Sequence, residues 1–216
     1  MTFITDKYDK HTQTFGEEIA NSISHGLAFL VAAAVSPMLI MAALQRGTME
    51  VIGAAIFTAT VMLLYLASTL YHAVPASKAK QFLHILDHAA IFLLIAGTYT
   101  PFTLGVLRNS WGWLLFALIW LLASGGIIMT VVSRVGYPRL AVGLYLGMGW
   151  LIVVAIWPLW LAMPLVGLLW LVAGGVAYTV GVAFYAAQWL PYSHFIWHLF
   201  VIAGTTCHFM AVYYAI

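Results

Sequence analysis

The segment VIGAAIFTATVMLLYLASTLYH, residues 51–72, contains no Asp, Glu, Lys or Arg. The hydrocarbon core of a bilayer requires about 20 consecutive apolar residues in a helix that crosses it, and this segment is long enough. Strands of a membrane β-barrel would alternate polar and apolar residues, and this segment does not alternate. The segment therefore predicts a transmembrane α-helix.

Six further segments of the same kind occupy most of the remaining chain. They cover residues 19–44, 85–107, 111–132, 140–161, 165–187 and 195–216. Turn-forming residues mark the breaks between them, and the break at Met163-Pro164 is the least marked. The sequence therefore predicts an all-α membrane protein, a seven-helix transmembrane bundle over residues 19–216. A short polar arm, residues 1–18, precedes it.

The composition excludes an ordinary water-soluble domain. Of the 216 residues, 64% are hydrophobic and 6% are charged, whereas soluble domains contain about 25% charged residues. The formal charge of +2 is small and scattered, so nucleic acid is not expected as a partner. Cys207 is the only cysteine, which excludes an intrachain disulfide and a thiolate-rich metal site. The first eighteen residues lack the apolar region of a cleavable signal peptide.

The basic residues predict the orientation of the bundle. Seven spans place the arm and the even-to-odd loops on one side, with Lys7, Lys10, Lys78, Lys80, Arg134 and Arg139. The other side has Arg46 and Arg108. Because basic loops remain in the cytoplasm, we expect a cytoplasmic N-terminus and an external C-terminus. Short loops favour a bacterial inner (plasma) membrane.

Ionisable residues inside a membrane are energetically unfavourable, so each one is a candidate functional residue. The predicted topology places most of them near the cytoplasmic face: His25, His72, His84, Asp87, His88, His194 and His198. Asp87 is the only acidic residue expected at or inside a span. His208 lies ten residues beyond His198 and so about 15 Å deeper.

The spacing of these residues is compatible with a metal site. His194 and His198 are four residues apart, so both face one side of a helix and can hold one ion. His72 would complete the three-ligand set of a catalytic zinc site with an open fourth position. Asp87 could act as general base toward a metal-bound water, and Ser68, one turn from His72, could orient that water or a ligand.

Other interpretations of the same residues remain open. A lone histidine in an apolar helix is commonly a buried hydrogen-bonding residue, which applies to His25 and His208. His84 and His88 could lie at the level of the lipid headgroups. The pairs Gly125-Gly126 and Gly174-Gly175 are interpreted as positions of close helix packing.

Five stretches together resemble the bacterial hemolysin III-like proteins. They are EEIANSISH (17–25), ASTLYH (67–72), LDHAAI (86–91), AGTYTPF (96–102) and SHFIWH (193–198). That family is grouped with the progestin and adiponectin receptors and, more distantly, with alkaline ceramidases. The resemblance implies a seven-helix bundle with zinc near the cytoplasmic face. By motif, His72, His194 and His198 match the zinc ligands, and Ser68 and Asp87 match the polar partners of the zinc-bound water.

Several functions are compatible with this interpretation, because fold does not fix function. The leading hypothesis is a zinc-dependent membrane hydrolase that acts on a lipid amide or ester. The alternative is a sensor or receptor-like regulator of membrane state with a structural zinc. An ion pathway is disfavoured because the polar groups cluster at one end, and pore-forming haemolysis because no span has a charged lining. Membrane lipids are the expected partners, and the sequence leaves the oligomeric state open.

Overall fold

The computed structural model describes residues 13–108 and 110–216. The elements within these ranges are all helical: α1 Phe15–Leu44, α2 Thr48–Ala73, α3 Lys78–Pro101, π-helix η1 Phe102–Val106, α4 Ser110–Ser133, α5 Pro138–Trp150, 3₁₀-helix η2 Leu151–Ala155, α6 Ile156–Ala162, α7 Leu165–Ala186 and α8 Ser193–Ala215. Seven of the described helical segments are long and apolar enough to cross a membrane. η1 prolongs α3, and α5, η2 and α6 together make the fifth span. The predicted all-α, seven-span fold is confirmed.

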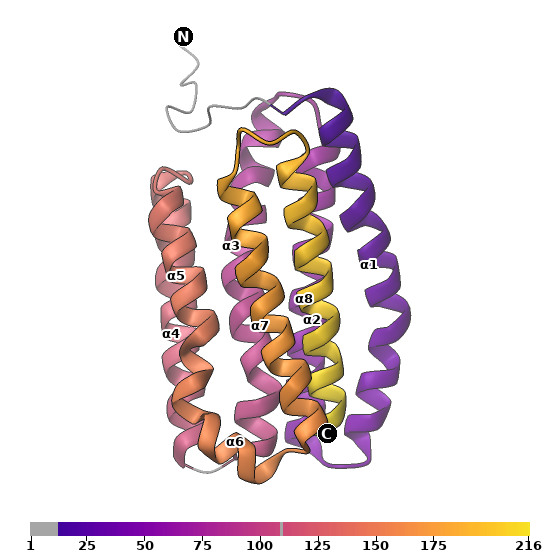
Figure 1. The fold of residues 1–216 in the computed structure, drawn as a ribbon, viewed down its shortest axis with the longest axis vertical. Helices are drawn as coiled ribbons and strands as arrows, with labels where there is room; N and C mark the ends of the chain where they lie inside the picture. The colour runs from indigo at the N-terminus through magenta and orange to yellow at the C-terminus, as the bar shows by residue number, and fades with distance from the viewer. Residues whose placement is uncertain (1–12, 109) are drawn as a thin grey trace.

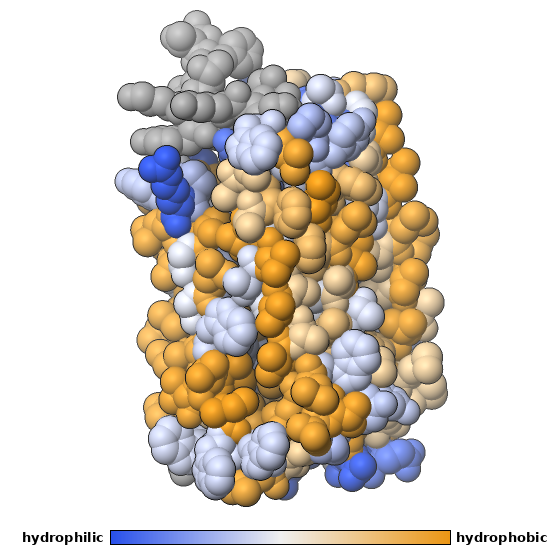
Figure 2. All heavy atoms as spheres, in the orientation of Figure 1, coloured by the Kyte–Doolittle hydropathy of each residue, from blue (hydrophilic) through white to orange (hydrophobic). Residues whose placement is uncertain are grey.

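The helices stand side by side in one bundle (Figure 1). Apolar side chains cover the middle of the face shown in Figure 2, and the most hydrophilic residues on that face lie toward its two ends. This is the distribution expected of a surface that meets lipid in the middle and water at both ends. The orientation of the bundle across the membrane remains a prediction. Lys7 and Lys10, on which it partly rests, lie outside the described residues.

α3 is the most buried span, with 72% of its apolar window inside the bundle. It packs against α2 and α4 and also contacts α5 and α8, whereas α1 packs against both α2 and α8. α2 ends, and α1, α3 and α8 begin, at one end of the bundle, which we call the histidine end. The helix order therefore brings segments far apart in the sequence to one place.

Of the described helices, α1 and α3 begin farthest ahead of the start that the hydropathy pattern predicts. α1 begins at Phe15 instead of residue 19, because Thr14 and Glu17 form a reciprocal capping box. α3 begins at Lys78 instead of residue 85, because the Ser77 hydroxyl accepts a hydrogen bond from the Lys80 backbone. Hydropathy locates the apolar part of a helix, whereas caps determine where the helix starts.

The earlier helix starts, including that of α2 at Thr48, correct one expectation about acidic residues in the spans. Glu17 and Glu18 belong to the first spanning helix, and Glu50 to the first turn of the second. The expectation that Asp87 is the only acidic residue at or inside a span is therefore wrong. The part of the predicted arm at residues 1–12 lies outside the described residues.

The fifth span contains an irregular stretch that α3 supports. At the junction of α5 and η2, the Tyr99 hydroxyl donates to the Met148 carbonyl at 2.6 Å and accepts from the Ile152 backbone at 2.7 Å. Backbone groups at membrane depth need such partners because lipid offers none. Tyr99 thus provides hydrogen bonds where the regular helical pattern is interrupted.

The two glycine pairs differ in how closely they are packed. A Cβ added at Gly126 would collide with the ring of Phe92, and one at Gly174 with His208. An added Cβ at Gly175 would meet Trp150 at 3.6 Å, and one at Gly125 would meet nothing within 4 Å. Close packing is therefore found at Gly126 and Gly174, and the interpretation of Gly125 as a packing residue is wrong.

These neighbours provide a matched pair of substitutions. We expect Gly126→Ala to destabilise the protein by about 1–3 kcal/mol relative to Gly125→Ala, because overpacking costs about that much and both gain the same helix propensity. Thermal unfolding of the two purified variants in one detergent measures the difference. Equal midpoints would contradict the packing of Gly126 on Phe92.

Candidate metal centre

The three histidines that the sequence predicts to converge do so at the histidine end. His72 lies at the end of α2, and His194 and His198 lie in the first two turns of α8. Each offers a ring nitrogen, and these three atoms lie within 4.8 Å of one another. The ring centroid of His72 is 5.2 Å from that of His194 and 5.1 Å from that of His198. Among the described residues, this is the group that could hold a metal ion.

His72 and His194 each have a buried ring nitrogen that is free to bind a metal ion. His72 Nδ1 lies 2.7 Å from a carboxylate oxygen of Glu18, which can only accept, so the ring donates from Nδ1. His72 Nε2 is then a lone-pair donor, and it is buried without a hydrogen-bond partner, as is His194 Nε2. Buried polar atoms are almost always paired, and unpaired ones point to an absent water or ion. The residues present therefore fit a metal ion.

Asp87 and Ser68 lie beside the histidine cluster. The Asp87 carboxylate is close enough to interact with the Ser68 hydroxyl and with the His72 ring. Ser68 Oγ is buried and makes no hydrogen bond of regular geometry. Both residues line the same cavity as His194 and His198. A polar group at the metal position would therefore find a carboxylate and a hydroxyl nearby.

His25 is also part of this cluster. Its ring stacks on that of His198, with centroids 3.7 Å apart and an interplanar angle of 5°. The side chain is buried, and neither ring nitrogen makes a hydrogen bond of regular geometry, although the His198 backbone is close enough to interact with the ring. The burial expected of His25 is confirmed. His25 lines the cavity and positions one face of a candidate ligand ring.

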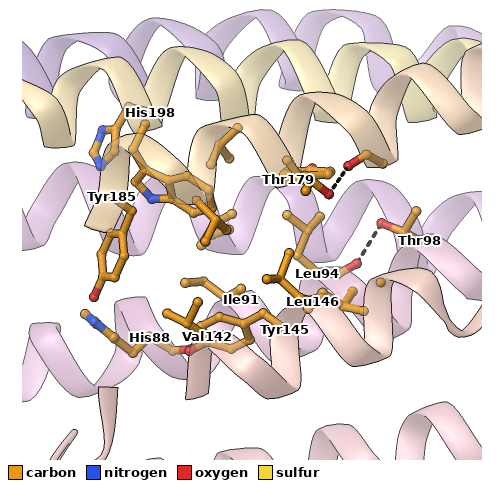
Figure 3. Close-up of a pocket in the computed structure, with 18 of the residues that line it drawn as sticks. His88, Ile91, Leu94, Thr98, Val142, Tyr145, Leu146, Thr179, Tyr185 and His198 are labelled. Atoms are coloured by element: carbon orange, nitrogen blue, oxygen red, sulfur yellow. Dashed lines mark hydrogen bonds between the residues drawn. The ribbon is translucent and has the colours of Figure 1, made fainter. Parts of the chain in front are cut away.

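His194 and His198 of the cluster line one end of a cavity with about 1100 Å³ of empty space, part of it open to the outside. Figure 3 shows His198, Tyr185 and His88 at one end and Leu94, Leu146, Thr179 and Thr98 farther along. Most of the surface that lines the cavity is apolar, and the lining comes from α1, α2, α3, α5, α7 and α8. The Tyr145 hydroxyl donates to the His88 carbonyl at 3.0 Å and so ties α5 to α3 beside the site. The cavity is thus long, mainly apolar and polar at the histidine end.

The remaining histidines take separate positions. His84 stacks on Tyr71, and His88 Nδ1 donates to the His84 carbonyl at 3.0 Å. His208 lies farther along the cavity and bonds the Leu171 carbonyl through Nε2 at 3.2 Å. The hydrogen-bonded interpretation of His208 is confirmed for that nitrogen. None of these three belongs to the candidate metal-binding group among the described residues.

Glu18 and Lys80 also belong to the site, although neither is among the predicted site residues. Lys80 Nζ lies 2.8 Å from Glu18 Oε1, while Glu18 Oε2 holds His72. Both residues were assigned to polar connections instead of helices. The Thr14-x-x-Glu17 capping box was the available signal, because it places Glu18 on the first turn of α1.

These observations define a class: a polytopic membrane protein with a candidate three-histidine metal centre at one end of an apolar cavity. Residues 13–209 match the profile of the family described as haemolysin-III related. The chain belongs to that family.

Relatives match over nearly the whole chain. Hemolysin-3 of Bacillus cereus is 43% identical over 210 residues, which cover 97% of this chain and 96% of that protein. A hemolysin-3 homolog of Bacillus subtilis (strain 168) is 40% identical, over 92% of this chain and 94% of that protein. The human monocyte to macrophage differentiation factor is 29% identical, over 94% of this chain and 86% of that protein. The similarity therefore extends over nearly all of the seven-span architecture.

Measurement of the metal content of the purified protein tests the candidate metal centre. We expect purified wild-type protein to contain about one divalent metal ion per chain and His198→Ala to lose most of it, because one of three ligands is gone. Inductively coupled plasma mass spectrometry measures both the amount and the element. His208→Ala is the control, since it removes a histidine from the same cavity outside the cluster. Equal metal content in all three proteins would place the ligands elsewhere.

Proposed function

We propose that the protein is a zinc-dependent membrane hydrolase that acts on an amide or ester bond of a lipid. One observation carries the proposal. His194 and His198 line the polar end of a mainly apolar cavity together with Asp87 and Ser68, and His72 completes the three-imidazole group beside them. An acyl chain in the cavity would place a polar linkage next to these groups.

The ligand set favours zinc and a catalytic site. Three imidazoles leave one position of a tetrahedral zinc ion open for water or substrate. A zinc ion held there would supply a water whose pKa is lowered to around 7 and a Lewis acid for a carbonyl oxygen. The residues of the chain would hold the ion, orient the substrate and move the proton.

Asp87 is the residue we assign to proton transfer. Among the described residues that line the cavity it is the only carboxylate. It would accept the proton of the attacking water and then deliver it to the leaving amine or alcohol, which balances the hydrolysis. Ser68, whose hydroxyl lies beside the Asp87 carboxylate, would orient the water.

The cavity supports a lipid as substrate. It is lined by apolar side chains such as Leu94, Ile95, Leu146 and Val201. An acyl chain would bind there favourably because its apolar surface would leave water. We further propose that the protein resides in the plasma membrane of a bacterium, where such lipids are available. The two Bacillus relatives support a bacterial setting.

A structural role for the metal is the second candidate. An ion held by His72 together with His194 and His198 would link α2 to α8. These two helices pack against each other much less than α1 packs against either of them. This would suit a sensor or regulator of membrane state. Metal removal would then lower the thermal midpoint without any hydrolysed product being formed by the wild type.

The names of the Bacillus relatives refer to haemolysis, and the cavity offers it little support. Among its described lining residues are histidines and one aspartate, with neither lysine nor arginine. A water-filled pore would be expected to carry a more polar lining than this one.

Loss of the proposed base should separate catalysis from metal binding. We expect Asp87→Asn to lower lipid hydrolysis by about 10²–10⁴-fold, the range for a general base, while the zinc content stays at the wild-type level. The assay incubates purified protein with N-acyl and O-acyl lipids in mixed micelles and quantifies released fatty acid by mass spectrometry. Glu50→Gln, at the opposite end of α2, is the control for loss of a carboxyl charge. Full turnover by Asp87→Asn would remove Asp87 from the mechanism.

The cavity predicts a dependence on acyl-chain length. Leu146 and Leu94 both line the cavity away from its histidine end (Figure 3), so Leu146→Trp should shorten the space available to a chain. We expect hydrolysis of long-chain substrates to fall at least several-fold more than that of short-chain ones. Leu121→Trp, on an exposed face of α4, is the control because it makes the same change in size outside the cavity. An equal loss for all chain lengths would argue that the acyl chain binds elsewhere.

A further inference from the structure

The first turns of α1 touch both helices that carry the candidate ligands. Toward α2, the Glu18 carboxylate meets His72, and the Ser22 hydroxyl donates to the Thr69 carbonyl at 3.2 Å. Toward α8, the Ser24 hydroxyl lies 3.4 Å from His198 Nδ1. α1 therefore bridges the two halves of the cluster.

Glu18 fixes the protonation pattern of the His72 ring. The carboxylate accepts from Nδ1 at 2.7 Å, which leaves Nε2 as the nitrogen with the free electron pair. The side chain of His72 is 0% exposed, so water cannot replace this partner without a rearrangement. The remaining nitrogen, Nε2, is the one without a partner that is available to an ion.

Lys80 fixes the carboxylate in turn. Its ammonium group lies 2.8 Å from Glu18 Oε1 and donates to the Tyr71 carbonyl at 3.1 Å. One carboxylate oxygen is thus occupied by the start of α3 and the other by the end of α2. The orientation of the His72 ring is set by a chain of partners that runs from α3 through α1 to α2.

Glu17 anchors the same turn to the start of α8. Its Oε1 accepts from the Tyr192 backbone at 2.8 Å, while Oε2 closes the capping box with Thr14. Tyr192 has a left-handed backbone with φ of 58° and immediately precedes α8, two residues before His194. Glu17 therefore stabilises the turn from which both α8 ligands begin.

We propose that Glu18 is a positioning residue of the metal centre, which acts through His72, and that Glu17 holds the turn that carries His194 and His198. The inference rests on the metal site of the proposed function and adds the group that orients one ligand. A carboxylate on the second nitrogen of a ligating histidine fixes its tautomer and makes the ring a stronger ligand. Adjacent acidic residues of one helical turn thus organise ligands from two other helices.

The test measures zinc affinity of the full-length protein in detergent by competition with a chelator of known affinity. We expect Glu18→Ala to weaken zinc binding by about 10–100-fold, as for other partners of ligating histidines. Glu18→Gln keeps an oxygen that can accept from Nδ1, so it should lose less. Glu50→Gln is the matched control and should bind zinc as the wild type does.

A double-mutant comparison separates action through His72 from a general structural effect. In a His72→Ala background, Glu18→Ala should change the residual zinc affinity by less than about twofold, because its partner is already gone. Glu17→Ala should lower the thermal midpoint of the metal-free protein in both backgrounds. An equal loss of affinity from Glu18→Ala with and without His72 would overturn the positioning role.

The outcomes distinguish this inference from the proposed function. If the wild type binds zinc and Glu18→Ala binds it equally tightly, the inference fails and the hydrolase proposal is untouched. If Glu18→Ala weakens binding but no lipid is hydrolysed, the inference holds and the hydrolase proposal fails. A wild type without zinc affinity would overturn both. Should Glu18→Ala not fold, Glu18→Gln and Lys80→Met provide the affinity comparison.

Discussion

Unpaired imidazole nitrogens inside an apolar helix bundle are the constraint around which this protein is built. His72 Nε2 and His194 Nε2 are buried without hydrogen-bond partners, and neither nitrogen of His25 makes a hydrogen bond of regular geometry. A buried polar group without a partner costs on the order of 1–3 kcal/mol, and lipid offers no replacement for water. An ion held by the cluster would satisfy several of these groups at once. The three-histidine group is therefore one that could hold a metal ion.

The helices around the histidine cluster have different structural roles. α3 supplies Asp87 and, through Tyr99, supports the irregular stretch of the fifth span. α5 and α7 line the apolar length of the cavity, and Tyr145 ties α5 to α3 beside His88. α1 contacts α2 and α8 and contributes the carboxylates that meet His72 and the start of α8. The proposed chemistry and lipid binding thus share one cavity, and separate helices hold it together.

The spans could be predicted because each depends on a local property. Runs of apolar residues the length of a bilayer core determine a helix without reference to its neighbours. Helix starts were predicted less well, since hydropathy does not register a cap such as Thr14 or Ser77. Because of that error, Glu18 was assigned to the polar arm, and its contact with His72 could not be predicted. For the same reason, the ion pair of Glu18 with Lys80, which lies in the first turn of α3, could not be predicted.

The sequence by itself determined the seven helices and the candidate ligands, because apolar length and i, i+4 spacing are properties of single segments. The predicted topology already suggested His72 as the third ligand beside the pair on the last span, and the family resemblance implied the same three residues. Only the tertiary structure decided that His25 stacks on His198, and that Gly126 is packed while Gly125 is open. It also decided that α1 bridges α2 and α8. These facts depend on how helices rotate and pair, which one segment read alone does not specify.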